Sequence, residues 1–324
     1  MSEGRAPEAI VWDLLRGAIT TRVLGLVVDL GIPAALAAGP KPVDALAIET
    51  GAGADAETLR RLMRALASEG VFTELEPGVF GHTEASELLL GGTGWAEFAH
   101  LFGGVWHRAA GEIQADGREP AFERIHGTDY WSWLAAHPEE REIFDRAMAE
   151  GRERRTDRLE AFAWRGDETV VDVGGGNGSL LVELLERRPG LRGIVLDLPE
   201  TVRDEEALGD RIEFVEGSFF ERVPRGDVYV LGTVLHDWDD ESAARILRTI
   251  RRSASGDSHL LVLDAVMRPG NEPDGSKWLD VLMLAVLSGK ERTEAQWREL
   301  LAAGGFEPVR FHEALIEAVP AADG

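Results

Sequence analysis

The sequence contains no cysteine, few basic residues and no long apolar run. Without cysteine there are no disulfides, thiol nucleophiles or thiolate metal sites. The 34 Lys and Arg stand against 58 Asp and Glu, for a formal net charge of -24 at pH 7, and charge of this sign repels nucleic acids and anionic membranes. The most apolar early run, residues 23–38, is too short to span a bilayer, and residues 1–5 lack the basic-then-apolar order of a signal peptide. These absences predict a soluble, cytoplasmic protein that binds neither nucleic acid nor membranes.

The 324 residues, of which 44% are hydrophobic, allow one large domain or two of ordinary size. Apolar residues recur near the helical period from Ile10 to Leu30, until Gly31 and Pro33 end the run. So many apolar positions in an early helix need a partner, which is either another part of this chain or a second copy of it.

Residues 43–90 predict a winged-helix outline. A short helix is followed by a glycine turn at 51–53, Asp55 is placed to cap a second helix, and two strands within 71–83 form a hairpin. The outline raises the hypothesis of DNA reading, but the region carries nine acidic and only three basic residues. A DNA reader needs a basic footprint, so a structural or dimerising role is favoured, with a ligand-responsive regulator as the alternative.

Residues 92–165 are expected to be mostly helical and are unusually rich in aromatic side chains. The simpler interpretation is a bridging helical layer with an aromatic core. The alternative is that some of these rings face an apolar pocket for an aromatic ligand. The arginines between 152 and 158 are interrupted by acids and predict a solvated helix face.

The remainder of the chain alternates between short apolar runs and helical segments. The runs lie at 169–173, 193–196, 228–231 and 259–263, with segments such as 179–188 and 240–252 between them. Strands that alternate with helices form a parallel sheet covered on both faces. The sequence therefore predicts an α/β fold with a doubly wound sheet.

A glycine loop follows the first of these strands. Gly174, Gly176 and Gly178 give G-x-G-x-G, whereas dinucleotide oxidoreductases use G-x-G-x-x-G, whose last position here is a serine. Asp172, just before the loop, would repel a pyrophosphate and suits a cationic ligand instead. Asp197 ends the next apolar run, 19 residues beyond Gly178, where doubly wound sheets present a carboxylate to ribose hydroxyls. A tight strand–helix turn and a nicotinamide oxidoreductase remain the alternatives.

Three further stretches make the pattern specific: residues 217–221 (GSFFE), 235–241 (LHDWDDE) and 289–293 (GKERT). With the glycine loop, in this order and spacing, the chain closely resembles the S-adenosylmethionine-dependent O-methyltransferases typified by plant caffeate and flavonoid enzymes and bacterial polyketide-tailoring enzymes. The resemblance covers nearly the whole chain. It implies a Rossmann-like doubly wound sheet of the class I methyltransferase type and an N-terminal, mostly helical winged-helix dimerisation domain. The expected domains are residues 1–100 for dimerisation, 101–160 for a helical bridge lining the acceptor pocket, and 161–324 for cofactor binding and catalysis.

The resemblance implies S-adenosylmethionine as the cofactor, with S-adenosylhomocysteine as its product. The residues expected to bind it are Asp172, Gly174, Gly176, Asp197, Leu198, Ser218, Phe219 and Trp238. Two positions depart from the family. Ser218 stands where the family usually has Asp, which weakens or reroutes a contact to the adenine. Gly232 stands where it often has Lys or Arg, and Arg152 is a candidate substitute.

The resemblance assigns His236 as the general base and Asp264 and Glu291 as the acids that orient it. The chemistry supports a base independently. A sulfonium methyl is already activated, so the enzyme must align an oxygen with it and remove the proton of that oxygen, which a histidine can accept at neutral pH. Asp264 is shorter than the family's usual Glu, which leaves its reach in doubt. Each residue also has a structural alternative: capping or packing for the histidine, a strand-end turn for Asp264, and solvation of the turn before a capping box at Thr293 for Glu291. Alignment without any base is the mechanistic alternative.

For the acceptor, the resemblance offers Phe144, Met148 and Met283, whose flexible thioethers and aromatic face suit a flat phenolic ring, with ordinary core packing as the alternative. No His, Asp or Glu cluster has convincing metal spacing, so we expect a metal-independent reaction. We expect a homodimeric O-methyltransferase acting on a hydroxylated aromatic intermediate of secondary metabolism, such as an antibiotic or polyketide precursor. The alternatives on the same fold are an N- or C-methyltransferase, a hydroxylase or a decarboxylase.

Overall fold

The computed structural model describes residues 6–50, 55–115, 119–149, 152–199, 201, 210–312 and 314–322. The chain divides into two compact units, Met1–Glu112 with His137–Glu150 and Ile113–Ala136 with Gly151–Gly324. The segment expected to form a bridge, residues 101–160, is therefore shared between the two units.

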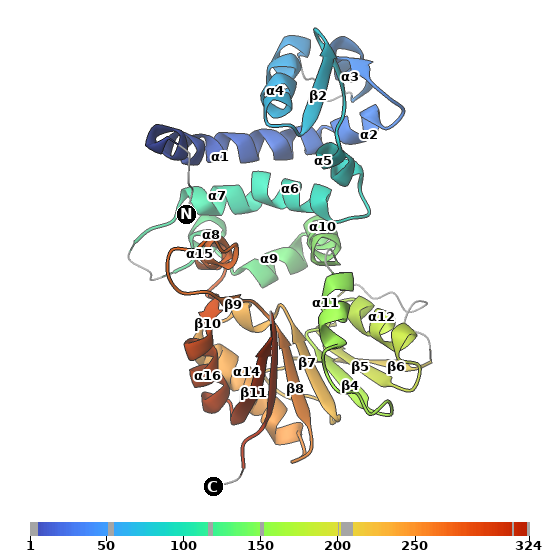
Figure 1. Cartoon of the computed structure of the whole chain (residues 1–324), viewed down its shortest axis with the longest axis vertical. Coiled ribbons are helices and arrows are strands. Elements are labelled where there is room, and N and C mark those ends of the chain that lie inside the picture. The colour runs from blue at the N-terminus through green and yellow to red at the C-terminus, as the bar shows by residue number, and fades with distance from the viewer. Residues whose placement is uncertain are drawn as a thin grey trace. The chain divides into compact units, whose positions relative to one another are not determined.

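Unit 1 is mostly helical (Figure 1). Its elements are α1 (Pro7–Asp29), α2 (Ile32–Leu36), β1 (Lys41–Pro42), α3 (Val43–Glu49), α4 (Ala56–Ser68), β2 (Phe72–Glu76), β3 (Val79–His82), α5 (Glu84–Glu87), the 3-10 turn η1 (Leu88–Leu90), α6 (Trp95–Gly103), α7 (Val105–Gly111) and α10 (Pro138–Ala149).

The winged-helix outline is present in this unit. The carboxylate of Asp55 accepts the backbone N–H groups of Glu57 and Thr58 and so caps α4 at its predicted start. The hairpin of β2 and β3 follows, and β1 adds a third strand in the order β1-β3-β2. Apolar residues of α2, α3, α4 and the hairpin form one buried core. The turn predicted at 51–53 lies outside the described residues.

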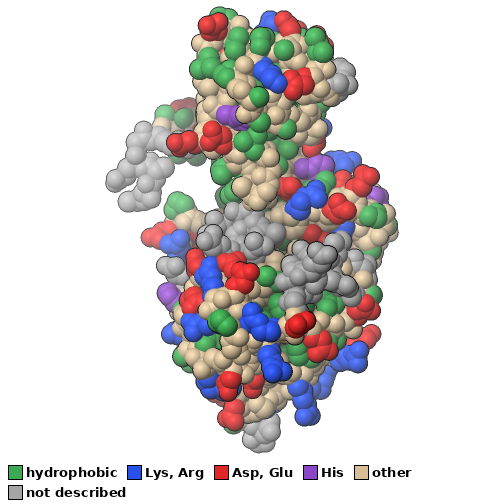
Figure 2. All heavy atoms as spheres, turned by 90° about the vertical axis from the view of Figure 1, so that its right-hand side faces the viewer, with side chains coloured by type: hydrophobic (Ala, Val, Ile, Leu, Met, Phe, Trp, Pro, Cys, Tyr) green, Lys and Arg blue, Asp and Glu red, His purple; other side chains and the backbone are tan. Residues whose placement is uncertain are grey.

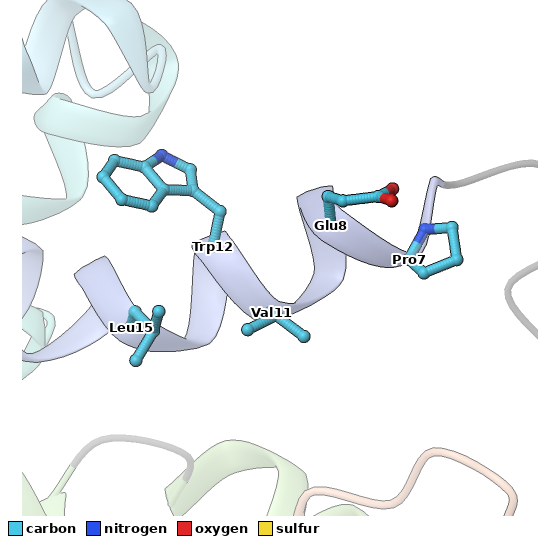
Figure 3. A pocket seen from close by; sticks show the side chains of 5 residues that line it. All are labelled: Pro7, Glu8, Val11, Trp12 and Leu15. Carbon is cyan, nitrogen blue, oxygen red and sulfur yellow. The ribbon is translucent and has the colours of Figure 1, made fainter.

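Helix α1 carries its apolar residues both inward and outward. Its second half packs on α4 and α6 and buries Val27. In the first half, five large apolar side chains are each at least 56% exposed: Val11, Trp12, Leu14, Leu15 and Ile19. Figure 3 shows Val11 and Leu15 on one side of the helix and Trp12 on another, around a shallow hollow of about 380 Å³. The expectation that this helix needs a partner therefore applies to its first half.

Unit 2 contains the remaining elements (Figure 1). They are α8 (Ala121–His126), α9 (Tyr130–Ala136), α11 (Arg152–Leu159), β4 (Thr169–Val173), α12 (Ser179–Arg187), β5 (Arg192–Asp197), β6 (Ile212–Glu216), β7 (Val228–Gly232), η2 (Leu235–Asp237), α14 (Asp240–Ser253), β8 (His259–Leu263), β9 (Val266–Met267), α15 (Ser276–Val286), β10 (Arg292–Thr293), α16 (Glu294–Ala303), β11 (Phe306–His312) and β12 (Leu315–Pro320).

A seven-stranded sheet with the order β11-β12-β8-β7-β4-β5-β6 organises the described part of unit 2. Strands β8, β7, β4, β5 and β6 are parallel, which confirms the doubly wound fold. The sheet is mixed, because at one edge β12 pairs antiparallel with β8 and β11 antiparallel with β12, an edge that the apolar runs did not predict. A tight connection between β11 and β12 favours antiparallel pairing, because a parallel pair needs a long crossover.

Helices cover both faces of this sheet, as predicted. Val171 and Val173 of β4 face a core shared with α14 and α16, whereas Val170 faces a second core shared with α11 and α12. The alternation follows from the period-2 geometry of a strand. The carboxyl ends of the parallel strands lie at one edge, which is where ligands bind in such sheets.

On the face shown in Figure 2, Lys and Arg side chains are interspersed with acidic ones rather than gathered in a continuous basic patch. Among the described residues, none of the helices is both long and apolar enough to cross a bilayer.

Candidate active site

The glycine loop connects β4 to α12 and is held against the end of β5. Gly174, Gly176 and Gly178 all have positive φ, between +58° and +80°, a conformation that side chains with a Cβ rarely adopt. The backbone N–H of Gly176 donates to Oδ2 of Asp197 at 2.7 Å. The loop therefore brings its backbone against the carboxylate of Asp197, at the carboxyl ends of β4 and β5.

Asp172 is a buried carboxylate at this loop. It is 1% exposed, and within the described part of the chain its Oδ2 atom has no hydrogen-bond partner. Burial, together with the nearby charge of Asp197, raises the pKa of Asp172 to about 7, and Arg155 of α11 opposes the rise. A buried and unpartnered carboxylate favours a ligand that brings a positive charge or an N–H donor.

Asp197 has capacity for one further contact. Its Oδ1 accepts the N–H of Leu198 at 2.7 Å and the hydroxyl of Thr201 at 2.8 Å, and its Oδ2 accepts Gly176. Because two carboxylate oxygens offer about four acceptor positions, one is left for a hydroxyl. Leu198 is 38% exposed beside it.

Three aromatic rings form one wall near the loop. Phe219 and Phe220 meet the ring of Trp238 edge-on, with centroids 6.0 and 4.8 Å apart. Phe219 also contacts Gly174, where a Cβ atom would lie 3.4 Å from the ring. Ser218 accepts the N–H of Phe220 at 3.2 Å through its hydroxyl. Gly232, which stands where the family often has Lys or Arg, is the last residue of β7. The side chain of Arg152, the candidate substitute, is not among the described side chains.

His236 lies on η2, just past the end of β7, and is 9% exposed. Its Nδ1 atom is 2.7 Å from Oε1 of Glu291. An ionised carboxylate can only accept, so Nδ1 carries the hydrogen and Nε2 is the nitrogen left for proton exchange. Oδ1 of Asp237 lies 3.4 Å from Nε2.

Asp264 follows β8 and is 2% exposed. Within the described residues neither of its oxygens makes a well-formed hydrogen bond, although the backbone N–H of Leu235 is close enough to lower its pKa, and Asp264 makes no hydrogen bond to the ring as Glu291 does. Strands β9 and β10 explain why both acids lie near the histidine. They pair in parallel with Arg292 opposite Val266, so Glu291, one residue before β10, and Asp264, two residues before β9, lie close to each other.

Electrostatics couple these four groups. Burial alone would lower the pKa of His236, but Asp237, the hydrogen bond to Glu291 and the charge of Asp264 outweigh it and raise the pKa to about 10. Burial raises the pKa of Asp237 to about 7 and that of Asp264 to about 6, against the opposing effect of His236. The cluster thus favours a positively charged imidazole.

Sequence reasoning missed three residues of this region. Asp237 was within reach, because it follows His236 in a stretch already singled out. Asp280 of α15 accepts the backbone N–H of Glu291 at 2.8 Å and so positions that acid. Arg155, expected on a solvated face, is half-buried and close enough to Asp172 to affect its pKa. Helical periodicity carries no signal for the last of these.

The expected acceptor residues belong to different units. Phe144 and Met148 lie one turn apart on α10 in unit 1, and Met283 is buried on α15 in unit 2. As for metals, no group of three or more His, Asp or Glu suited to an ion occurs in the described ranges.

Residues 106–307 match the family described as O-methyltransferase domain, and residues 12–92 match the O-methyltransferase dimerisation domain. The phenazine O-methyltransferase PhzM of Lysobacter antibioticus is 38% identical, over 98% of this chain and 94% of that protein. The crystal structure of LaPhzM has a TM-score of 0.90 with 37% identity and covers 98% of this chain and 100% of that one. NcsB1, an O-methyltransferase from neocarzinostatin biosynthesis solved with S-adenosylhomocysteine and 1,4-dihydroxy-2-naphthoic acid, has a TM-score of 0.75, 31% identity and coverage of 93% and 96%.

Proposed function

The chain belongs to the O-methyltransferase family in which a dimerisation domain precedes the catalytic domain, and on this premise we propose that it methylates a hydroxyl of an aromatic small molecule with S-adenosylmethionine as donor. The acceptor class is an intermediate of secondary metabolism, such as an antibiotic precursor. This proposal is supported by relatives that act on phenazines or bind a dihydroxynaphthoic acid. We also propose that the enzyme works in the cytoplasm and without a metal.

The residues at the carboxyl edge of β4, β5 and β6 fit such a donor. Asp172 would pair with its ammonium group, the Gly174–Gly178 backbone would line its methionine end, and Asp197 would accept a ribose hydroxyl. Leu198, Ser218, Phe219 and Trp238 would surround the adenine. When bound, the donor supplies a methyl group already activated by a sulfonium centre. The unpartnered Oδ2 of Asp172 is the observation that supports this fit most directly.

His236 would act as the general base through Nε2. The donor would supply a methyl group whose bond to sulfur breaks as its bond to the acceptor oxygen forms, leaving S-adenosylhomocysteine. Nε2 would take the proton of that oxygen, and the negative charge of Glu291 would stabilise the resulting imidazolium. The ring must first be neutral, and a cationic donor nearby would lower its raised pKa. Asp264 would act through charge alone. The hydrogen bond between His236 and Glu291 is the observation that carries the proposed reaction.

Phe144 and Met148 of α10, and separately Met283 of α15, are proposed to contact the aromatic ring of the acceptor. The exposed apolar first half of α1, which overlaps the family's dimerisation region at residues 12–92, supports a homodimer. A second copy would cover side chains that are otherwise in contact with water.

Two measurements test the proposal. Calorimetry with S-adenosylhomocysteine should detect binding, and incubation of a phenolic panel with the donor should yield products heavier by one CH₂. Absence of binding at millimolar concentration contradicts the donor assignment. A mass gain other than CH₂, or methylation at nitrogen or carbon, contradicts the O-methylation assignment instead.

A further inference from the structure

Arg292, at the start of β10, is completely buried. A guanidinium stays charged at all relevant pH values and cannot be buried without partners for its five N–H groups. Its Nη1 donates to the carbonyl oxygens of Leu235 at 2.9 Å and Lys290 at 3.3 Å, and its Nη2 donates to that of Trp238 at 2.8 Å.

Two further contacts fix the plane of this guanidinium. Its Nε donates to Oδ1 of Asp240 at 2.9 Å, and its central carbon lies 5.4 Å from the ring centroid of Trp297. Trp297 is itself buried and donates its indole N–H to the carbonyl of Ala265. Most of the hydrogen bonds of this arginine therefore go to backbone carbonyls rather than to carboxylates.

Those carbonyls flank the turn that carries the base. Leu235 precedes His236 in η2, and Trp238 ends the same turn. The backbone N–H of Lys290 also donates to the carbonyl of His236 at 2.8 Å. Gly289 permits this approach, since a Cβ atom there would lie only 2.0 Å from that carbonyl oxygen.

The segment that packs against this turn carries the acid. Glu291 is the residue immediately before Arg292, and its side chain makes the 2.7 Å contact to Nδ1 of His236. The two segments are 55 residues apart in sequence, so their alignment depends on contacts between them. Besides the His236–Glu291 hydrogen bond and the ion pair of Lys290 with Asp240, these contacts include the hydrogen bonds of the Arg292 side chain.

We propose that Arg292 is a positioning residue for methyl transfer: it locks the turn bearing His236 against the segment bearing Glu291 and thereby holds the base and its acid together. This inference rests on the proposed role of His236 as the base. Lysine could not replace the arginine, because a single ammonium cannot reach carbonyls on both sides of the turn in the fixed planar geometry of a guanidinium.

The test compares R292K with R211K. Arg211 also donates to two backbone carbonyls, those of Leu185 and Pro189, at a place away from the site. R292K should lower kcat by at least about tenfold while the KM for the donor changes by less than roughly threefold. R211K should leave both unchanged.

Two readouts separate positioning from plain stability. In R292K the Nδ1–H signal of His236 in proton NMR should weaken. The ascending limb of the kcat/KM profile, on which His236 loses its proton among Asp237, Asp264 and Glu291, should move down toward the ordinary histidine range. In the double variant with E291Q, the second loss should be much smaller than the first, because both changes break the same pairing.

If R292K does not fold, D240N and W297F test the inference in its place. Each changes one partner of the guanidinium, and each should move the ascending limb of the kcat/KM profile in the same direction by a smaller amount. An unchanged pH profile in R292K, or in both substitutes, contradicts the inference, as do losses that multiply in the double variant. Full turnover by H236A, run in parallel, contradicts the proposed base instead, so the two failures are distinguishable.

Discussion

The Nδ1 atom of His236 lies 2.7 Å from Oε1 of Glu291, although 55 residues separate them in sequence. This contact fixes which ring nitrogen can exchange a proton, and it contributes to the raised pKa of the imidazole. Both consequences can be measured.

Replacing His236 with Ala should lower turnover by roughly 10²–10⁴-fold, the usual contribution of a positioned base. The affinity for S-adenosylhomocysteine should stay nearly unchanged, because the residues proposed to hold the donor are others. Steady-state kinetics and calorimetry on the same preparation measure the two effects. Turnover within threefold of the parent would mean that alignment alone carries the reaction.

Glu291→Gln should reduce turnover more than Asp264→Asn. Glu291 touches the ring, whereas neither oxygen of Asp264 makes a well-formed hydrogen bond within the described chain. Each change removes a negative charge that raises the pKa of His236, so in both variants the ascending limb of kcat/KM, where His236 loses its proton, should move to lower pH. The measurement is a pH–rate series with one acceptor, and the reverse ranking of the two variants would contradict the geometry.

The strands of the central sheet show what periodicity can predict. Residues 169–173 and 259–263 were predicted to the residue, because each is a short, mostly apolar run of the length of one buried strand. Strands β6, β11 and β12 were not predicted, since charged residues interrupt their apolar patterns. Because β11 and β12 were not predicted, the antiparallel edge of the sheet was not predicted either.

The site divides in the same way. Asp172, Asp197 and Asp264 end or follow apolar runs, so the parallel topology alone predicts that they meet at one edge. The burial of Arg292 and the approach of Asp237 to Nε2 depend on the shape of a three-residue turn. No sequence period encodes that shape.

Asp172→Asn should make stability less dependent on pH. The folded-state pKa of Asp172 is about 7, above its ordinary value of 3.8, so the folded state binds the proton more tightly. The carboxyl group of Asp172 therefore destabilises the folded state least at low pH. As the pH rises toward about 7, it lowers the free energy of unfolding by about 1.4 kcal/mol for each pH unit. Urea unfolding from pH 5 to 8 measures this.

The difference in the free energy of unfolding between the Asn variant and the parent should grow from pH 5 to pH 7 and level off above pH 7. His236, Asp237 and Asp264 also have raised pKa values and act in the same direction, so only the difference between variant and parent isolates Asp172. Asp167→Asn, which removes a carboxylate that is 85% exposed, serves as the control. A constant difference across the window would contradict the buried-carboxylate account.

Leu15→Asp should convert a dimer into monomers. Leu15 is 67% exposed on α1, among other apolar side chains that a single copy leaves in water (Figure 3). Burying a leucine contributes about 1.5–3 kcal/mol, and a two-fold symmetric interface counts it twice. An aspartate at the same place would lose its hydration without gaining a partner.

Ile48→Asp is the matched control, because Ile48 is 82% exposed on α3, outside this cluster. Analytical ultracentrifugation should show the parent and the Ile48 variant as dimers and the Leu15 variant at half their mass. A Leu15 variant that sediments with the parent would mean that the exposed half of α1 is not the surface through which two copies meet.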